Sequence, residues 1–134
     1  MYRIGKTFRF EAAHYLPNHD GPCRTLHGHS YQLEVVIEGD QLIAQGPKEG
    51  MLLDYADLKE VVQPIIDRFD HAGLVQERLQ AIPALPSTAE VIAQRVYFWL
   101  EPNFRATVAL LHSVRVKETE STFAEFIHDN CPFK

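Results

Sequence analysis

The sequence predicts an α+β fold: a four-stranded antiparallel sheet with two helices packed on one of its faces. Three observations support this class. Two long segments at the N-terminus alternate apolar and polar residues, as half-buried strands do. Two segments in the middle of the chain carry apolar residues at helical spacing. A second pair of alternating segments follows, so the predicted order is two strands, two helices and two strands.

Length and composition indicate one domain that spans residues 1–134. The hydrophobic share of 46% is sufficient for a core, while a net charge of -5 without a long Lys/Arg cluster argues against a nucleic-acid surface. No apolar run is long enough to span a membrane, and the first residues lack the apolar stretch of a signal peptide. Two cysteines, Cys23 and Cys131, do not make a disulfide framework. We therefore expect a reducing, cytoplasmic location.

The first two strands are predicted at residues 2–14 and 27–38. His14 falls on the apolar face of the first strand, and His27 and His29 fall on the apolar face of the second. The apolar residues of these two faces include Phe8, Phe10, Ala12, Tyr31, Leu33, Val35 and Ile37. If the strands pair antiparallel, the end of the first lies beside the start of the second. The three imidazoles should then converge at one end of a hairpin.

The first helix is predicted to begin near Asp54, because an acidic residue before an apolar stripe is typical of a helix start. The stripe continues to Phe69, and Pro64 within it should kink the helix. Just before the helix, Met51–Leu53 is expected to form a short strand.

The second helix is predicted to follow an irregular segment, residues 75–86. Ser87 and Glu90 have the spacing of a capping box, in which the first residue caps the helix and the second bonds back to it. The apolar stripe that follows ends at Glu101, because proline occupies the next position.

The last two strands are predicted at residues 107–118 and 123–128. Strict alternation in the first of them places Leu110, His112 and Val114 on one face, with Glu118 at its end. We expect this strand to extend the sheet formed by the N-terminal hairpin.

His14, His27 and His29 form a candidate metal site. Neutral imidazole is a preferred ligand of zinc, and three protein ligands leave a coordination position open, as in catalytic sites. Alternatively, the histidines are hydrogen-bonded side chains at the entry of a hairpin. Burying three imidazoles without partners is costly, which favours the metal interpretation.

Three further groups have possible chemical roles. Cys23, in the loop at residues 15–26, could act as a thiolate base beside a metal ion, or could be a small buried apolar residue. Asp70 followed by His71 could form a proton relay, or could be an ordinary helix C-terminus. Glu118 on an apolar face could accept two parallel hydrogen bonds from a flat N–C–N edge, or could lie in solvent beyond the strand.

Five motifs, taken together and in this order, resemble the 6-pyruvoyl-tetrahydropterin synthase / 6-carboxy-tetrahydropterin synthase family. The resemblance covers roughly residues 3–127. The motifs are Phe10-Glu11-Ala12-Ala13-His14, Cys23-x-x-x-His27-Gly28-His29, Phe69-Asp70-His71, Pro86-Ser87-Thr88-Ala89-Glu90 and Val116-Lys117-Glu118-Thr119.

The resemblance implies the tunnelling, or T-fold, module, in which subunits form trimeric barrels and two trimers stack into a homohexamer. It implies 7,8-dihydroneopterin triphosphate as the small-molecule substrate and one Zn²⁺ per subunit. By position, the zinc ligands would be His14, His27 and His29. Cys23 would be the base that moves protons on the substrate side chain.

The resemblance also implies that Asp70 and His71 assist proton transfer across a subunit interface. Glu118, with Thr119 beside it, would bind the amino-pyrimidine edge of the pterin. Bacterial relatives often have a basic residue after the first histidine, where this chain has Tyr15. Arg24 is therefore a possible substitute in contacts with the triphosphate.

The spacing of Cys23 is the best indication of the product. Three residues separate it from His27, as in bacterial carboxy synthases of queuosine biosynthesis. The expected reaction therefore yields 6-carboxy-5,6,7,8-tetrahydropterin with release of acetaldehyde and triphosphate. The alternatives are a 6-pyruvoyl synthase, which eliminates triphosphate from the same substrate, and a non-catalytic oligomer stabilised by metal.

Overall fold

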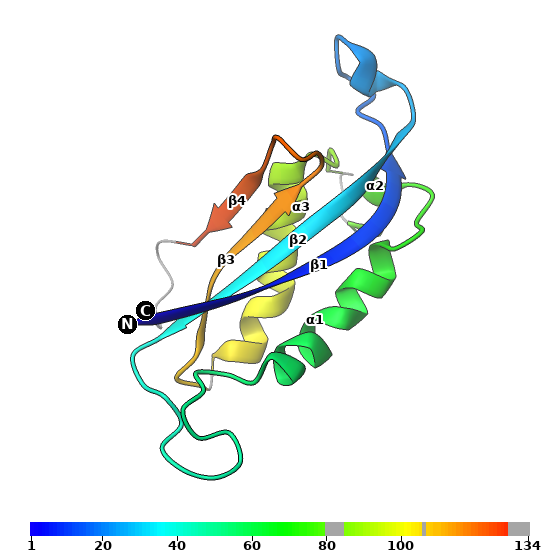
Figure 1. Cartoon of the computed structure of the whole chain (residues 1–134). Helices are drawn as coiled ribbons and strands as arrows, with labels where there is room; N and C mark the ends of the chain where they lie inside the picture. The colour runs from blue at the N-terminus through cyan, green and yellow to red at the C-terminus, as the bar shows by residue number, and fades with distance from the viewer. Residues whose placement is uncertain (80–84, 106, 129–134) are drawn as a thin grey trace.

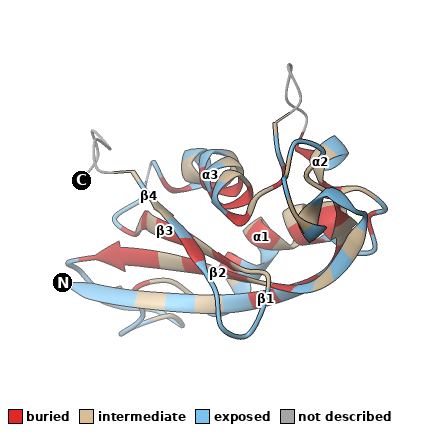
Figure 2. Cartoon of the chain, turned by 90° about the horizontal axis from the view of Figure 1, so that it is seen from above, coloured by how far each residue is buried: buried red, intermediate tan, exposed pale blue. Residues whose placement is uncertain are grey.

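The fold is a four-stranded antiparallel sheet in the order β1-β2-β3-β4, with the helices packed on one face (Figures 1 and 2). The computed structural model describes residues 1–79, 85–105 and 107–128. Its strands are β1 (Tyr2–His14), β2 (His27–Gly39), β3 (Leu110–Lys117) and β4 (Ala124–Ile127). Its helices are α1 (Tyr55–Phe69), α2 (Val75–Arg78) and α3 (Ala89–Leu100), with short 3-10 turns η1 (Pro22–Arg24) and η2 (Glu101–Phe104). The predicted fold class is confirmed.

The N-terminal hairpin is the longest element of the sheet. β1 and β2 pair in continuous antiparallel register from Tyr2 opposite Gly39 to His14 opposite His27. The predicted faces are confirmed, because burial alternates along both strands and the buried side faces the helices. The antiparallel register places His14 directly beside the first residue of β2.

Helix α1 begins as predicted, because the Asp54 carboxylate accepts a hydrogen bond from the backbone N–H of Ala56 and caps the first turn. The helix continues through Pro64 to Phe69. The expected short strand at Met51–Leu53 is wrong. The Met51 carbonyl accepts the backbone N–H of Ile43 and the Met51 N–H donates to the carbonyl of Lys48, which closes a loop rather than forming a ladder.

The start of α3 differs from the predicted capping box. Thr88 is the N-cap, and its hydroxyl accepts the backbone N–H of Val91. Ser87 does not cap the helix, because its hydroxyl and carbonyl contact His14 instead. Within the predicted irregular segment, Val75–Arg78 forms the short helix α2. Pro83, which supported the irregular prediction, lies outside the described residues.

Strand β3 is shorter than predicted and its face changes partway along. It begins at Leu110 rather than at residue 107, and the register with β2 shifts between Val36 and Ile37. The extra residue at this bulge places Leu111, not Leu110 or His112, on the buried face. Strict alternation therefore failed here, and β3 ends one residue before Glu118.

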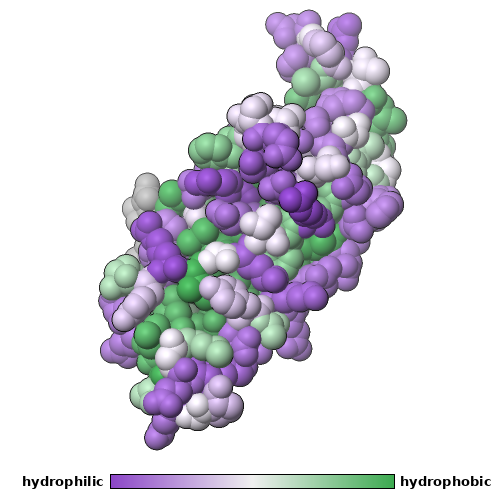
Figure 3. All heavy atoms as spheres, in the orientation of Figure 1, coloured by the Kyte–Doolittle hydropathy of each residue, from purple (hydrophilic) through white to green (hydrophobic). Residues whose placement is uncertain are grey.

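The core lies between the helices and the covered face of the sheet. Phe10 stacks on Tyr31 with ring centroids 4.7 Å apart and on Phe69 at 5.4 Å, so aromatic rings link β1, β2 and α1. Figure 3 views the opposite, helix-free face, where hydrophilic side chains predominate. None of the helices within the described residues is both long enough and apolar enough to cross a membrane.

Candidate metal centre and active site

Three histidines converge at one end of the N-terminal hairpin, as predicted. His14 ends β1, and His27 and His29 lie two apart at the start of β2, so their side chains share the face of the sheet that the helices cover. One ring nitrogen of each can be chosen such that all three lie within 4.8 Å of one another. The ring centroids are 4.6 to 5.0 Å apart.

Hydrogen bonds fix the tautomer of two of these histidines. His14 Nδ1 lies 2.9 Å from the carbonyl oxygen of Ser87, and His27 Nδ1 lies 2.7 Å from the carbonyl oxygen of Thr25. A carbonyl only accepts, so each Nδ1 carries the proton and donates it. Each Nε2 therefore keeps a free lone pair, which is the state that a metal ion requires.

The cluster has the properties of a metal site. Among the described residues, Nε2 of His14 and Nε2 of His29 are buried without a hydrogen-bond partner. Burial is the main cause that lowers the pKa of both imidazoles, and the neighbouring histidines add to it. Buried ring nitrogens without a hydrogen-bond partner are unfavourable unless a cation binds them. These residues fit a divalent metal of the zinc type, since tetrahedral zinc separates nitrogen ligands by about 3.4 Å.

The Glu118 carboxylate lies beside this cluster. It lies one residue beyond β3, and its Oε2 is 4.0 Å from His29 Nε2 with 26% of the side chain exposed. Burial raises its pKa and Glu90 adds to the effect, while His14 and His27 oppose it. The alternative that Glu118 lies free in solvent is therefore wrong, although the strand has ended before it.

Cys23 lies in the loop that leads into β2, within the short turn η1. Its carbonyl accepts the backbone N–H of Leu16 at 2.8 Å, which ties the two sides of the loop together. Arg24 follows it on the exposed surface. The thiol is half-buried and is not a member of the three-histidine cluster.

A cavity of about 380 Å³ opens beside the same loop. It is lined by Tyr15, Leu16, Pro17, Asn18, His19, Gln76, Leu85, Pro86 and Thr88. Tyr15 and Pro86 are the chain neighbours of His14 and Ser87, so the cavity adjoins the candidate metal ligand His14. Its lining is largely apolar.

Asp70 and His71 are held against β1 rather than within the histidine cluster. Asp70 Oδ1 accepts the backbone N–H of Glu11 at 2.9 Å, and the backbone N–H of His71 donates to the carbonyl of Glu11. Asp70 Oδ2 is 3.1 Å from His71 Nδ1. The His71 ring is 80% exposed and its backbone has φ 57°, a left-handed conformation uncommon outside glycine. The structure thus presents this pair to solvent along the edge strand of the sheet.

The sequence did not predict two polar residues near the site, Ser87 and Gln76. One predicted substrate-binding residue, Thr119, lies apart from the three histidines. Ser87 contacts His14, and Gln76 contacts Ser87; neither contact has a local sequence signal. Thr119 lies in the exposed turn after β3, where its hydroxyl bonds to that of Thr122 at 2.7 Å.

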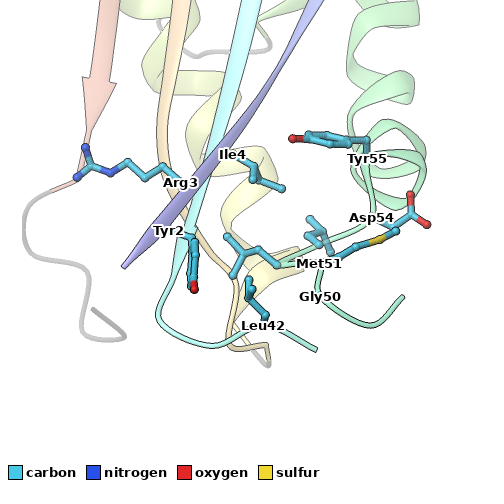
Figure 4. Close-up of a pocket in the computed structure, with 10 residues that line it drawn as sticks. Tyr2, Arg3, Ile4, Leu42, Gly50, Met51, Asp54 and Tyr55 are labelled. Atoms are coloured by element: carbon cyan, nitrogen blue, oxygen red, sulfur yellow. The ribbon is translucent and has the colours of Figure 1, made fainter. Parts of the chain in front are cut away.

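A second cavity, of about 350 Å³, lies at the other end of the sheet (Figure 4). Tyr2, Leu42, Met51 and Tyr55 are among the side chains that line it. Strand β1 spans thirteen residues from Tyr2 at this cavity to His14, a distance of about 40 Å at the rise of an extended strand. This cavity therefore belongs to a different part of the molecule.

The sheet, the covering helices and the three-histidine cluster define a class: small α+β proteins with a candidate metal centre at the end of a hairpin. Comparison with known sequences is more specific. A sequence model of the 6-pyruvoyl tetrahydropterin synthase family matches residues 3–129. The chain therefore belongs to this family.

Curated relatives agree along nearly the whole chain. The 6-carboxy-5,6,7,8-tetrahydropterin synthase of Haemophilus influenzae is 36% identical, over 94% of this chain and 99% of its own length. The protein of the same name from Synechocystis is 39% identical, over 94% and 93%. A 6-pyruvoyl tetrahydrobiopterin synthase from Dictyostelium discoideum is 29% identical, over 79% and 73%.

Solved structures show the same fold. The 6-pyruvoyl tetrahydropterin synthase of Caenorhabditis elegans superposes with a TM-score of 0.78 at 24% identity, covering 96% of each chain. The Plasmodium vivax enzyme of that name gives 0.60 at 18% identity, covering 94% of this chain and 98% of its own. The predicted T-fold is confirmed.

Proposed function

We propose that this protein is a zinc-dependent 6-carboxy-5,6,7,8-tetrahydropterin synthase. It converts 7,8-dihydroneopterin triphosphate to the carboxylated pterin, with release of acetaldehyde and triphosphate. The observation that carries the proposal is the pair of buried, unpartnered Nε2 atoms of His14 and His29, close to a ring nitrogen of His27 and to the half-buried Glu118. The names of the Haemophilus and Synechocystis relatives favour the carboxy product.

The chain's own residues have distinct roles in this proposal. His14, His27 and His29 hold the metal, which when bound supplies Lewis-acid activation of the side-chain hydroxyls. The Glu118 carboxylate accepts two N–H bonds from the amino-pyrimidine edge and so orients the ring, with Thr119 at its border. Arg24, exposed on the loop, neutralises triphosphate charge.

Proton transfer requires a base near the substrate side chain. Cys23 lies four residues before His27 on the loop that borders the cavity, and a thiolate beside a divalent cation is a competent base. His71 is the second candidate for proton transfer, and the Asp70 carboxylate contacts its Nδ1. Because the His71 ring is 80% exposed at the edge strand, we propose that it serves the site of a neighbouring subunit. This arrangement implies a homo-oligomer, which we propose to be a hexamer of two stacked trimers in the cytoplasm.

A second candidate is a 6-pyruvoyl synthase, which the Dictyostelium relative favours. Incubation of the purified protein with dihydroneopterin triphosphate separates the two, because only the carboxy synthase releases acetaldehyde. Mass analysis of the pterin identifies the product. A chelator-treated sample with and without added Zn²⁺ is the control. Turnover that is unaffected by metal removal, or no turnover by a metal-loaded protein, contradicts the proposal and leaves the metal with a stabilising role only.

A further inference from the structure

The three candidate metal ligands are not equally constrained by the protein. His14 is buried, at 1% exposure, whereas His27 and His29 are half-buried. His27 is oriented by Thr25, a residue of its own loop. His14 is oriented by Ser87, which is 73 residues away in sequence and 0% exposed. Among the described residues, His14 is the only one of the three ligands held by a hydrogen bond that joins the hairpin to the helical layer.

The contacts of Ser87 define one direction of hydrogen bonding. His14 Nδ1–H donates to the Ser87 carbonyl at 2.9 Å and also lies 3.1 Å from the Ser87 hydroxyl oxygen. A hydroxyl that accepts from an N–H is free to donate its own proton. That proton goes to Gln76 Oε1, at 3.3 Å. The chain of donors therefore runs from His14 through Ser87 to Gln76.

Gln76 is well placed to support this chain. It lies on α2, which packs against β1 and buries its first residue, Val75. Gln76 itself is half-buried and lines the cavity of about 380 Å³ beside the site. Its amide oxygen accepts from the same Ser87 hydroxyl that lies beside His14 Nδ1.

We propose that Ser87 and Gln76 are positioning residues for the metal centre. They hold His14 in the tautomer that leaves Nε2 free and aim this nitrogen at the other two ligands, and so they raise the affinity for the metal. The proposal rests on the proposed metal function. It adds that part of the affinity originates outside the three histidines, in α2 and in the segment that precedes α3.

The variants Ser87→Ala and Gln76→Leu test this proposal. Loss of an outer partner of a metal-bound histidine commonly weakens metal binding by about 10- to 100-fold. Ser87→Ala keeps the carbonyl bond, so we expect a loss near the lower limit, about tenfold. Gln76→Leu should give a smaller loss in the same direction. It should have no further effect in the Ser87→Ala background, because it acts through the Ser87 hydroxyl.

Metal-stripped protein is titrated with Zn²⁺ against a chromophoric chelator, and the visible spectrum of the Co²⁺ form reports the ligand geometry. Ser113→Ala is the matched control, because Ser113 is also buried and its hydroxyl has no hydrogen-bond partner within the described residues. It should keep the wild-type affinity and spectrum. Gln76→Glu, which keeps an acceptor, should restore what Gln76→Leu loses. If Ser87→Ala does not fold, the comparison of the two Gln76 variants decides the question.

Wild-type affinity in Ser87→Ala, or equal affinity in Gln76→Leu and Gln76→Glu, overturns this inference and leaves the proposed function intact. A wild-type protein that binds no divalent metal overturns the proposed function and this inference with it.

Discussion

Replacing Tyr31 by phenylalanine should stabilise the metal-free protein, although tyrosine hydroxyls in cores usually contribute to stability. Tyr31 is 0% exposed and stacks on Phe10, yet its hydroxyl has no hydrogen-bond partner among the described residues. Burial, and then the Glu118 carboxylate, raises the pKa of this phenol. The hydroxyl is thus a neutral, desolvated donor without an acceptor.

An unsatisfied buried hydroxyl costs about 1–3 kcal/mol. Removing one oxygen also leaves a small void, so we expect a net gain of about 1 kcal/mol in the free energy of unfolding. For a chain of 134 residues, unfolding entropies of about 2.1 cal/mol/K per residue convert this gain to a rise of about 3.5 °C in Tm.

Tyr97→Phe is the matched control. Tyr97 is equally buried, at 1% exposure, but its hydroxyl donates to the carbonyl of Leu111 at 3.3 Å. Its removal should therefore destabilise the protein by about 1 kcal/mol. The assay is urea unfolding of both variants and the wild type, after metal removal and at one protomer concentration. A Tyr31→Phe variant that loses as much stability as Tyr97→Phe would refute the reasoning, since the hydroxyl would then have a partner.

Four further predictions concern the site. Cys23→Ala should bind metal as the wild type does but lose turnover by about 100-fold or more, as expected for a lost general base; unchanged turnover with metal bound excludes Cys23 as the base. An inactive Cys23→Ala protein mixed and reassembled with inactive His71→Ala should regain part of the activity if His71 serves a neighbouring subunit; no recovery in verified mixed oligomers argues for a site within one chain. Glu118→Gln should raise KM by about tenfold, because one of two charge-assisted bonds to the pterin is lost, and a KM equal to that of wild type contradicts the assigned role. The backbone N–H of Glu11, and secondarily His71, lower the pKa of Asp70 below its ordinary value of 3.8. The charged carboxylate therefore stabilises the folded protein at pH values above 3.8, and this contribution is lost as the pH falls below 3.8. The stability difference between wild type and Asp70→Asn should then shrink on acidification in urea unfolding; a pH-independent difference would show that the carboxylate charge is not involved.

Local patterns in the sequence were sufficient for the hairpin and its histidines. Alternation placed His14 and His29 on the covered face, and antiparallel pairing brought the strand ends together. The bulge opposite Val36 could not be read from alternation, because one extra residue changes the face without changing the composition. His112 thereby contacts Glu38, with 3.2 Å between its Nδ1 and the carboxylate, instead of facing the core.

Contacts between distant segments were the other limit. Ser87 and Thr88 are both good N-cap residues, and the sequence alone favours Ser87 through the capping box. The structure gives the cap to Thr88, because the Ser87 hydroxyl is engaged by His14 and Gln76. The attachment of Asp70 to Glu11 depends likewise on packing across 59 residues of sequence. No periodic pattern in the sequence indicates either of these contacts.

The pairing of His14 with His27 would link binding of the proposed metal to folding. A slip of one residue between β1 and β2 would turn the imidazole of one strand to the opposite face from those of the other. A metal ion that needs all three can bind only the correctly aligned hairpin. Metal binding would therefore select the correct strand register during folding. Chains with misaligned strands would remain metal-free, and the ion would stabilise the aligned ones.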